Sequence, residues 1–210
     1  MVATTIAPDP TLIPARPGMS LVDYLARGSE RFELINGKEI ARSPTGYQHD
    51  SLQENLYDNL KAYVKSHHLG QVMIEHTFID PASTAAKWVT GSVTPDIMFV
   101  AGTRVDEYNA NPFINPDLPL PLVPELVIEI VSPTDRKAAI LEKISYLLAL
   151  GVQVIWSIKP QRQSVIVYTP DADETVLTGD NVLATDLLPG WSIAVRDLFL
   201  PSLLSPAQKD

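Results

Sequence analysis

The chain has 210 residues, 45% of them hydrophobic, no cysteine and a formal net charge of −9. The length allows one sizeable domain with its own core. The absence of cysteine excludes disulfides and thiolate metal sites. The negative net charge argues against electrostatic binding of nucleic acid over a broad surface, although a local basic groove remains compatible with it. Since no apolar run approaches the length of a membrane span and residues 1–20 lack the basic start and apolar block of a secretory signal, we expect a cytoplasmic protein.

The first part of the chain predicts a tail, a short helix and a hairpin. Residues 1–18 carry four prolines and are expected to form a flexible N-terminal tail. Ser20 is the predicted N-cap of a helix that stops at Gly28. In the stretch RFELINGKEIA, the pair Asn36-Gly37 predicts a hairpin with a type I′ turn.

The next part predicts the longest helix and two strands. Over residues 46–70 the helix pattern ends at Gly70, and its apolar face consists of Leu52, Leu56, Leu60 and Val64. Residues 71–80 and 92–102 each read as a strand, with a polar link between them. Prolines at 112, 116, 119, 121 and 124 predict a long loop, and loops of this length are often functional.

The last part predicts a buried strand, a helix and a second hairpin. The strand covers residues 126–132. The helix covers residues 133–151, with Ser132 as N-cap and Pro133 in its first position, and the hairpin covers residues 152–170. Short strands follow to about residue 200, before a polar C-terminal tail over residues 201–210. We therefore expect a single domain over residues 19–200, of α/β or α+β class, in which helices surround a mixed sheet.

Glu129 stands in the middle of the most apolar strand pattern, LVIEIVS. Side chains alternate along a strand, so Glu129 shares its face with Val127 while Ile128 and Ile130 occupy the other face. In SVTPDIMFV, Asp96 likewise sits among apolar residues. A carboxylate is costly to bury without a partner, so two of them on neighbouring strands suggest a shared task. Mg²⁺ is usually held by one or two carboxylates together with waters and substrate phosphate, and we expect Asp96 and Glu129 to hold Mg²⁺ or Mn²⁺.

Lys143 interrupts the apolar stripe of the helix that follows this strand, between Ile140 and Leu147. The rise per residue of helix and strand would bring Lys143 back to the level of Glu129 if the helix folds antiparallel onto the sheet. We therefore expect Lys143 to point at Glu129 and to orient the attacking water or stabilise developing charge. The alternative is a lysine whose stem covers apolar surface, beside acids that are satisfied by backbone amides or by that lysine without a metal.

Several short motifs occur in one order from about residue 20 to residue 200: RFELINGKEI, SP and H, then TPDI, LVIEIVSPTDR, GVQVIWSIKP and LPGW. Pro95-Asp96 followed by Glu129 resembles the core of PD-(D/E)xK nucleases, and the whole series resembles the Uma-two family. The resemblance implies a restriction-endonuclease-like core, a central mixed sheet flanked by helices, and a metal-dependent phosphodiesterase.

The resemblance also adds site residues and shows departures. Glu33 matches an acid of the family and His49 a family-like position near the start of the long helix, so both are expected to assist catalysis, with Glu54 as a rival of Glu33. Valine occupies position 131, where the general nuclease pattern has its lysine, and the family's lysine corresponds to Lys143. Positions 139 and 159, aspartate in many relatives, are alanine and lysine here. The other histidines, His67, His68 and His76, lack metal-ligand spacing and read as surface residues.

Two functions remain open at this point, besides a purely structural Glu129–Lys143 ion pair. The first is a Mg²⁺- or Mn²⁺-dependent endonuclease that hydrolyses phosphodiester bonds in DNA, working as a homodimer. The second is a nuclease-derived binding or regulatory module with little catalysis, which the acidic charge and the missing peripheral acids favour. The arrangement of the basic residues distinguishes these functions. If they cluster at the mouth of the Asp96–Glu129 cleft, a nucleic-acid ligand is favoured, and if they scatter, an interaction module or a small-molecule hydrolase is favoured. These residues are Arg42, Lys61, Lys65, Lys87 and Arg104.

Overall fold

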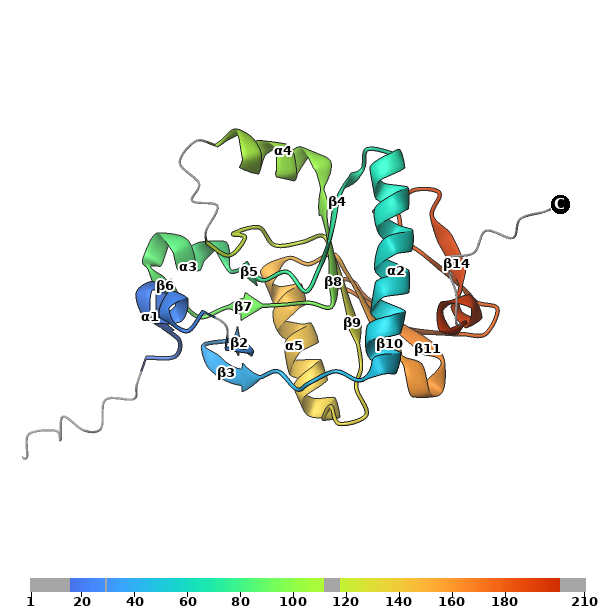
Figure 1. Cartoon of the computed structure of the whole chain (residues 1–210), viewed down its shortest axis with the longest axis horizontal. Coiled ribbons are helices and arrows are strands. Elements are labelled where there is room, and N and C mark those ends of the chain that lie inside the picture. Colours follow the sequence, from blue (N-terminus) through green and yellow to red (C-terminus); the bar gives the residue numbers. More distant parts are fainter. Residues whose placement is uncertain (1–15, 29, 112–117, 201–210) are drawn as a thin grey trace, which may run out of the picture.

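A six-stranded mixed sheet forms the centre of the fold (Figure 1). In the computed structural model, which describes residues 16–28, 30–111 and 118–200, the strand order is β12-β11-β10-β9-β8-β4. These strands are β4 (Gly70–Ile74), β8 (Ile97–Ala101), β9 (Leu126–Ile130), β10 (Val154–Lys159), β11 (Ser164–Thr169) and β12 (Ala172–Thr178). β9 runs parallel to β10 and the other neighbours are antiparallel, so the predicted mixed sheet is confirmed.

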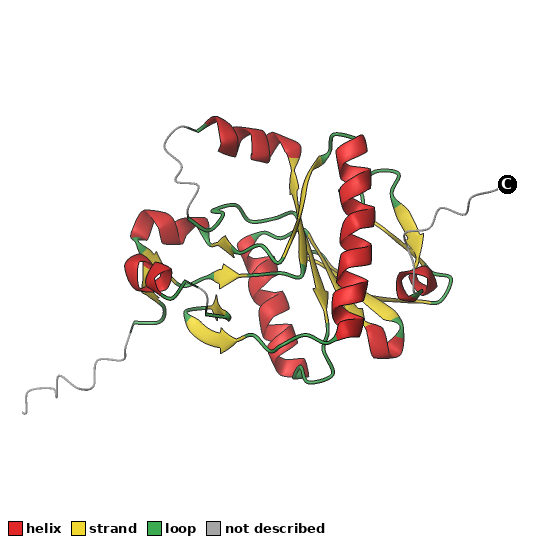
Figure 2. Ribbon diagram, in the orientation of Figure 1, coloured by secondary structure: helices red, strands yellow, loops and turns green. Residues whose placement is uncertain are grey.

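Two helices cover opposite faces of this sheet (Figures 1 and 2). The long helix α2 (Tyr47–Ser66) packs on the face that carries Ile97 and Ile128, and it does so with the predicted residues Leu52, Leu56, Leu60 and Val64. Helix α5 (Lys137–Leu150) packs on the face that carries Met98 and Val127. The alternation along β8 and β9 therefore separates two hydrophobic cores, as the sequence pattern predicts.

A second, smaller sheet with the order β3-β2-β7-β5 lies beside α5. Its strands are β2 (Phe32–Ile35), β3 (Lys38–Ala41), β5 (Phe78–Ile79) and β7 (Ser92–Val93). The β2–β3 hairpin turns at Asn36 and Gly37, whose φ angles of 52° and 74° confirm the type I′ turn. The last residues of the predicted N-terminal tail contact this region, because the Gly18 amide donates to the Gly37 carbonyl at 2.8 Å. Residues 1–15 and 201–210 of the predicted tails lie outside the described residues.

Several short elements complete the fold. Helix α1 (Leu21–Ala26) begins at the predicted N-cap, since the Ser20 hydroxyl accepts from the Asp23 amide. Helices α3 (Pro81–Ala86) and α4 (Gly102–Ala110) are not predicted by the sequence pattern. Of the predicted long loop, residues 112–117 lie outside the described residues. The remaining elements are β1 (Met19–Ser20), β6 (Trp88–Val89), β13 (Val182–Ala184), β14 (Ser192–Ala194) and the 3₁₀ helices η2 (Pro160–Arg162) and η3 (Val195–Phe199). Within the described ranges, no helix combines the length and apolar character needed to cross a bilayer.

Two of the predicted strands are each divided between the two sheets. Residues 70–74 belong to the central sheet and residues 78–79 to the smaller one, with Glu75 in a left-handed conformation at the break (φ 47°). Residues 92–93 and 97–101 are divided in the same way, at Pro95, which has no amide to donate to a ladder. The second break places Asp96 directly before β8 instead of inside a strand.

The predicted ends of the two long helices are also corrected. Helix α5 begins at Lys137 with Arg136 as its N-cap, four residues after the expected start. Ser132 is not a cap, because its amide donates to the Asp135 carboxylate at 2.8 Å and residues 133–134 form a turn. Helix α2 ends at Ser66, and Gly70 (φ 152°) begins β4, where a side chain would lie 2.2 Å from the Val100 carbonyl oxygen. Gly70 therefore allows β4 and β8 to approach closely, and it does not end the helix.

Candidate active site

Asp96, directly before β8, lies opposite Glu129 of the neighbouring strand β9. Strands β8 and β9 pair Phe99 with Leu126, Met98 with Val127 and Ile97 with Ile128, so the next pair in this register is Asp96 with Glu129. Opposite residues of an antiparallel pair share one face of the sheet. The Ile130 amide also donates to Asp96 Oδ2 at 2.6 Å, which fixes the aspartate at the end of β9. The expectation that two buried strands bring these acids together is confirmed.

Lys143 of α5 reaches both Glu129 and Glu33. Its Nζ lies 2.9 Å from the Glu129 carboxylate and 3.0 Å from Glu33 Oε1. Glu33 is buried in β2, where its Oε1 also accepts from the Thr94 amide at 2.9 Å. The predicted contact between Lys143 and Glu129 is confirmed, and Glu33 adds a third acid from the smaller sheet.

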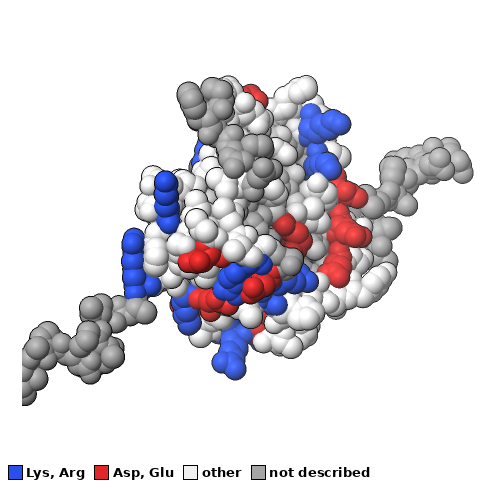
Figure 3. Space-filling view, turned by 60° about the vertical axis from the view of Figure 1, so that its left-hand side comes forward, with Lys and Arg blue, Asp and Glu red and all other residues white. Residues whose placement is uncertain are grey.

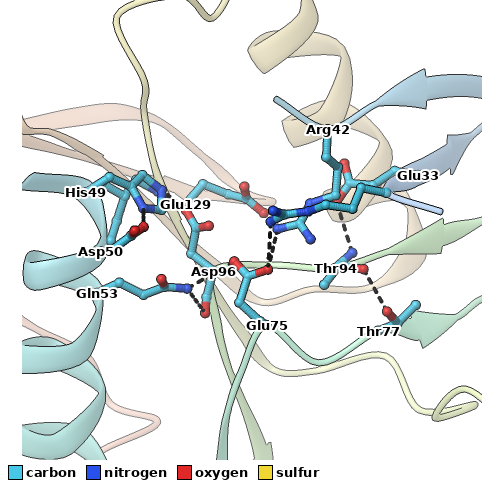
Figure 4. Close-up of polar contacts among 12 residues, drawn as sticks. Glu33, Arg42, His49, Asp50, Gln53, Glu75, Thr77, Thr94, Asp96 and Glu129 are labelled. Carbon is cyan, nitrogen blue, oxygen red and sulfur yellow. Dashed lines mark hydrogen bonds and ion pairs between the residues drawn. The ribbon is translucent and has the colours of Figure 1, made fainter. Parts of the chain in front are cut away.

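His49 brings α2 into the same site. It lies in the first turn of the helix, with Nε2 3.3 Å from Asp96 Oδ2 and Nδ1 3.2 Å from Asp50 Oδ1. Figure 4 shows His49, Asp96 and Glu129 facing one another from three elements. The five residues that the sequence analysis singled out line one cavity of about 180 Å³: Glu33, His49, Asp96, Glu129 and Lys143.

The other candidates are exposed. Glu54, the rival of Glu33, is exposed on α2, and it does not line this cavity among the described residues. His67, His68 and His76 are exposed, as predicted.

A second layer of polar residues, which the sequence analysis missed, supports the cavity. Gln53 Nε2 donates to the Asp96 carbonyl oxygen at 2.9 Å and to Glu75 Oε1 at 3.1 Å. Glu75 in turn accepts from Arg42 Nη2 at 2.8 Å. Figure 4 shows Arg42 between Glu33 and Glu75. The spacing of His49 and Gln53, one helical turn apart, was a signal for Gln53, whereas no local pattern links Glu75 to Arg42.

The environment of Asp96 and His49 favours their charged forms. Burial alone would raise the pKa of Asp96, but His49, the Ile130 amide and the charge of Lys143 lower it below its ordinary value. Burial likewise opposes protonation of His49, yet the hydrogen bond to Asp96 and its charge raise the pKa of the imidazole. The pair is therefore an ionised carboxylate oriented by a histidine that is easily protonated.

The environment of Glu129 and Lys143 is different, because three carboxylates surround one ammonium. Burial raises the pKa of Glu129 to about 8 against the opposing charge of Lys143, and the nearby Asp96 and Glu33 add to the rise. Burial would lower the pKa of Lys143, but Glu129 and Glu33 raise it above its ordinary value. The surplus of acids keeps the lysine protonated, and burial beside other carboxylates favours the protonated form of Glu129.

The donor set fits a hard divalent cation. Glu129 Oε1 is buried and makes no hydrogen bond to a described residue, although it lies 2.9 Å from Lys143 Nζ. The buried Glu125, by contrast, is satisfied, since its carboxylate accepts from the Ala101 amide at 2.9 Å and pairs with Arg104. Two carboxylates are the number that Mg²⁺ usually takes from protein. In the described part of the chain, no group of three or more acidic or histidine side chains is arranged to enclose a metal.

The basic residues whose arrangement distinguishes the candidate functions are scattered. Arg42 lines the cavity, but Lys61 and Lys65 lie beside a separate depression next to β4 and α4, and Arg104 pairs with Glu125. Figure 3 shows lysine and arginine side chains interspersed with aspartate and glutamate over the lower half of one face. These residues do not gather at the mouth of the cleft, and their scattering favours an interaction module or a small-molecule hydrolase.

Comparisons with known proteins agree with the fold. The Uma2 family model, described as "Putative restriction endonuclease", matches residues 21–196. Among solved structures, a crystal structure described as "a putative nuclease belonging to DUF820 from Anabaena variabilis ATCC 29413" matches with a TM-score of 0.70 and 22% sequence identity, over 86% of this chain and 97% of that one. At this identity the likeness concerns the fold alone. None of the curated proteins compared matches the chain.

Proposed function

The chain belongs to the Uma2 family, and on that premise we propose that it is a Mg²⁺- or Mn²⁺-dependent endonuclease that hydrolyses phosphodiester bonds in DNA. The observation that carries the proposal is the cavity in which Asp96 and Glu129 lie opposite each other with Lys143 on Glu129. Glu33 and Glu129 share the single ammonium of Lys143, so negative charge is left over in the cavity, and a divalent cation is the partner that Asp96 and Glu129 suit. The homodimer and the cytoplasmic location stay predictions.

In this proposal, Asp96 and Glu129 would hold the metal ion. The ion would lower the pKa of a bound water and offset negative charge on the phosphate. His49 orients the Asp96 carboxylate through the 3.3 Å contact, and the Ile130 amide holds the same oxygen. Both contacts reduce the freedom of the ligand before substrate arrives.

Lys143 is proposed to act as a donor of positive charge and not as a base. Its raised pKa keeps the ammonium protonated at neutral pH, so its N–H groups can bind the attacking water or a phosphate oxygen. Hydrolysis adds the hydroxyl of water to phosphorus and a proton to the leaving ester oxygen. Glu33 holds the other side of the ammonium and so sets its direction.

Calorimetric titration of Mg²⁺ and Mn²⁺ tests the metal site directly. We expect binding by the wild type, loss of binding in Asp96→Asn and in Glu129→Gln, and unchanged binding in Glu142→Gln. Glu142 is a matched control because it is an exposed glutamate of the same helix as Lys143. A folded wild type that binds neither ion, or a Glu129→Gln protein that still binds, would contradict the proposal.

A nuclease-derived binding module is the second candidate, and the scattered basic residues favour it. Ala139 lines the cavity, at a position where the resemblance to the family implies an aspartate, so this site has one acid fewer than that pattern. Under this reading, DNA cleavage is absent in Mg²⁺ and Mn²⁺ even if a metal binds. A cleavage assay on plasmid and on single-stranded DNA, run on protein already shown to bind metal, separates the two candidates.

A further inference from the structure

A second and larger cavity adjoins the candidate active site. Its volume is about 500 Å³, compared with about 180 Å³ for the first, and Arg42 lines both. The two are also linked behind this arginine, because Thr94 of the second cavity donates its amide to Glu33 of the first. Sites for small molecules usually measure about 300–1,000 Å³, so the second cavity has room for a nucleotide whereas the first suits a single phosphate.

Two arginines, Arg31 and Arg42, meet at the edge of the second cavity. Arg42 Nη2 lies 2.8 Å from Glu75 Oε2, and Arg31 Nη2 lies 3.8 Å from the same oxygen. Two guanidinium groups thus share one carboxylate. Gln53 holds the other oxygen of Glu75, which fixes the carboxylate from the side of α2.

The Arg42 guanidinium is both fixed and incompletely used. Its side chain is 17% exposed, compared with 53% for Arg31. One of its five N–H groups donates to Glu75, and the guanidinium makes no further hydrogen bond within the described residues. A planar guanidinium held in one direction by a carboxylate is well suited to bind a phosphate through its remaining N–H groups.

The second cavity offers apolar surface as well as charge. Tyr24, Phe32, Leu118 and Pro119 lie in its wall, and Tyr24 and Phe32 pack edge to face with ring centroids 5.7 Å apart. A nucleotide combines a phosphate with a flat, largely apolar base, so a cationic edge and an aromatic wall match its two halves.

We propose that Arg42, together with Arg31, binds the phosphate next to the one that is hydrolysed, and that the second cavity receives the nucleotide that follows it along a DNA strand. This inference rests on the proposed endonuclease function, because it assigns the first cavity to the scissile phosphate. It makes Arg42 a substrate-binding residue, whose effect falls on long substrates and not on a small diester confined to the first cavity.

Binding of a fluorescein-labelled short single-stranded DNA, followed by anisotropy, tests the proposal without requiring cleavage. The measurements use a Glu129→Gln background, in which a proposed metal ligand is absent. We expect Arg42→Gln to weaken binding about tenfold and to reduce the slope of log affinity against log salt by about 0.7. Arg42→Lys should recover part of the affinity, since it restores the charge without the planar fork.

Arg196→Gln is the matched control, because it removes another arginine from an ion pair on η3 and lines neither cavity within the described residues. Unchanged affinity and salt slope in Arg42→Gln, or an equal loss in Arg196→Gln, would overturn the proposal. So would a background protein that binds no single-stranded DNA. If Arg42→Gln unfolds, its melting curve shows this. Arg42→Lys then tests the proposal, because it keeps the charge and its slope of log affinity against log salt should equal that of the background protein.

The wild type separates failure of this inference from failure of the proposed function. With Mn²⁺, we expect it to hydrolyse both the oligonucleotide and bis(p-nitrophenyl) phosphate, and Arg42→Gln to raise KM for the oligonucleotide alone. Hydrolysis of both substrates with equal KM changes would refute the role of Arg42 and leave the endonuclease standing. Absence of all hydrolysis, together with Arg42-dependent binding of DNA, would refute the endonuclease and support the binding role.

Discussion

Replacement of Lys143 by methionine measures how much free energy the buried charge cluster contributes to folding. The Lys143 side chain is 16% exposed, and its ammonium lies 2.9 Å from Glu129 and 3.0 Å from Glu33. Methionine keeps much of the side-chain length but leaves both acids without a counter-charge. Removing one partner of a buried ion pair costs about 3–5 kcal/mol, which in a protein of this size lowers Tm by about 6–20 °C.

Urea denaturation followed by tryptophan fluorescence is the appropriate assay. Urea does not screen charges as guanidinium salts do, and the buried, stacked pair Trp156 and Trp191 reports on the core. Lys38→Met is the matched control, because Lys38 pairs with Glu142 at 3.8 Å with both side chains well exposed. An exposed pair of this kind contributes at most about 1 kcal/mol.

The double variant Lys143→Met/Glu129→Gln sharpens the test. Removing the second charge should recover part of the loss, because one fewer carboxylate is left uncompensated. A Lys143→Met protein within about 1 kcal/mol of the wild type would refute the reasoning, since the cluster would then be solvated. A double variant as stable as the wild type, in a protein whose wild type binds no metal, would instead identify a structural ion pair.

Four further predictions concern three residues, Glu129, Leu56 and Gly70. Because the pKa of Glu129 is raised to about 8, Mg²⁺ affinity measured by calorimetry should rise up to about tenfold per pH unit between about pH 6 and 8 and then level off; a flat profile would contradict this. In the metal-free protein, the raised pKa of Glu129 adds to the free energy of unfolding, fully below the ordinary pKa of 4.5. This contribution is lost as the pH rises through about 8, and urea titrations at several pH values measure the loss. Leu56→Ala, at a fully buried position of α2, should cost about 2–5 kcal/mol in the same titration, and a loss below about 1 kcal/mol would mean that α2 does not pack as described. Gly70→Ala should destabilise by more than about 1 kcal/mol, because φ is 152° and the new Cβ would lie 2.2 Å from the Val100 carbonyl oxygen; an unchanged midpoint would show that β4 and β8 can separate at little cost.

The sequence by itself determined the features that depend on neighbours along the chain. The Asn36-Gly37 turn, the Ser20 cap and the apolar face of α2 each follow from the chemistry of a few adjacent residues. Strand alternation separated Glu129 from Ile128, and helical spacing placed Lys143 on the stripe that faces the sheet. These signals were sufficient to identify Asp96, Glu129 and Lys143, whereas Glu33 and His49 were added by the resemblance to the family.

Local signals misplaced the points where the chain changes sheet or begins a helix. Glu75 and Pro95 divide two apparently continuous strands, because the apolar residues on either side of each break are buried in different sheets. Helix α5 starts at Lys137 although Ser132-Pro133 has the composition of a helix start, since Asp135 already satisfies the Ser132 amide within a turn. Propensity alone does not decide between two ways of satisfying the same amide.

Only the tertiary structure decided which polar groups meet across the cavity. Lys143 and Glu33 are 110 residues apart in the chain, and Arg42 and Glu75 are 33 apart. Their pairing depends on the register of β8 against β9 and on how the smaller sheet leans over α5, and no periodicity within one segment encodes either. The sequence determined which residues carry charge on the inner faces of the elements, and packing determined which of those charges lie within hydrogen-bonding distance.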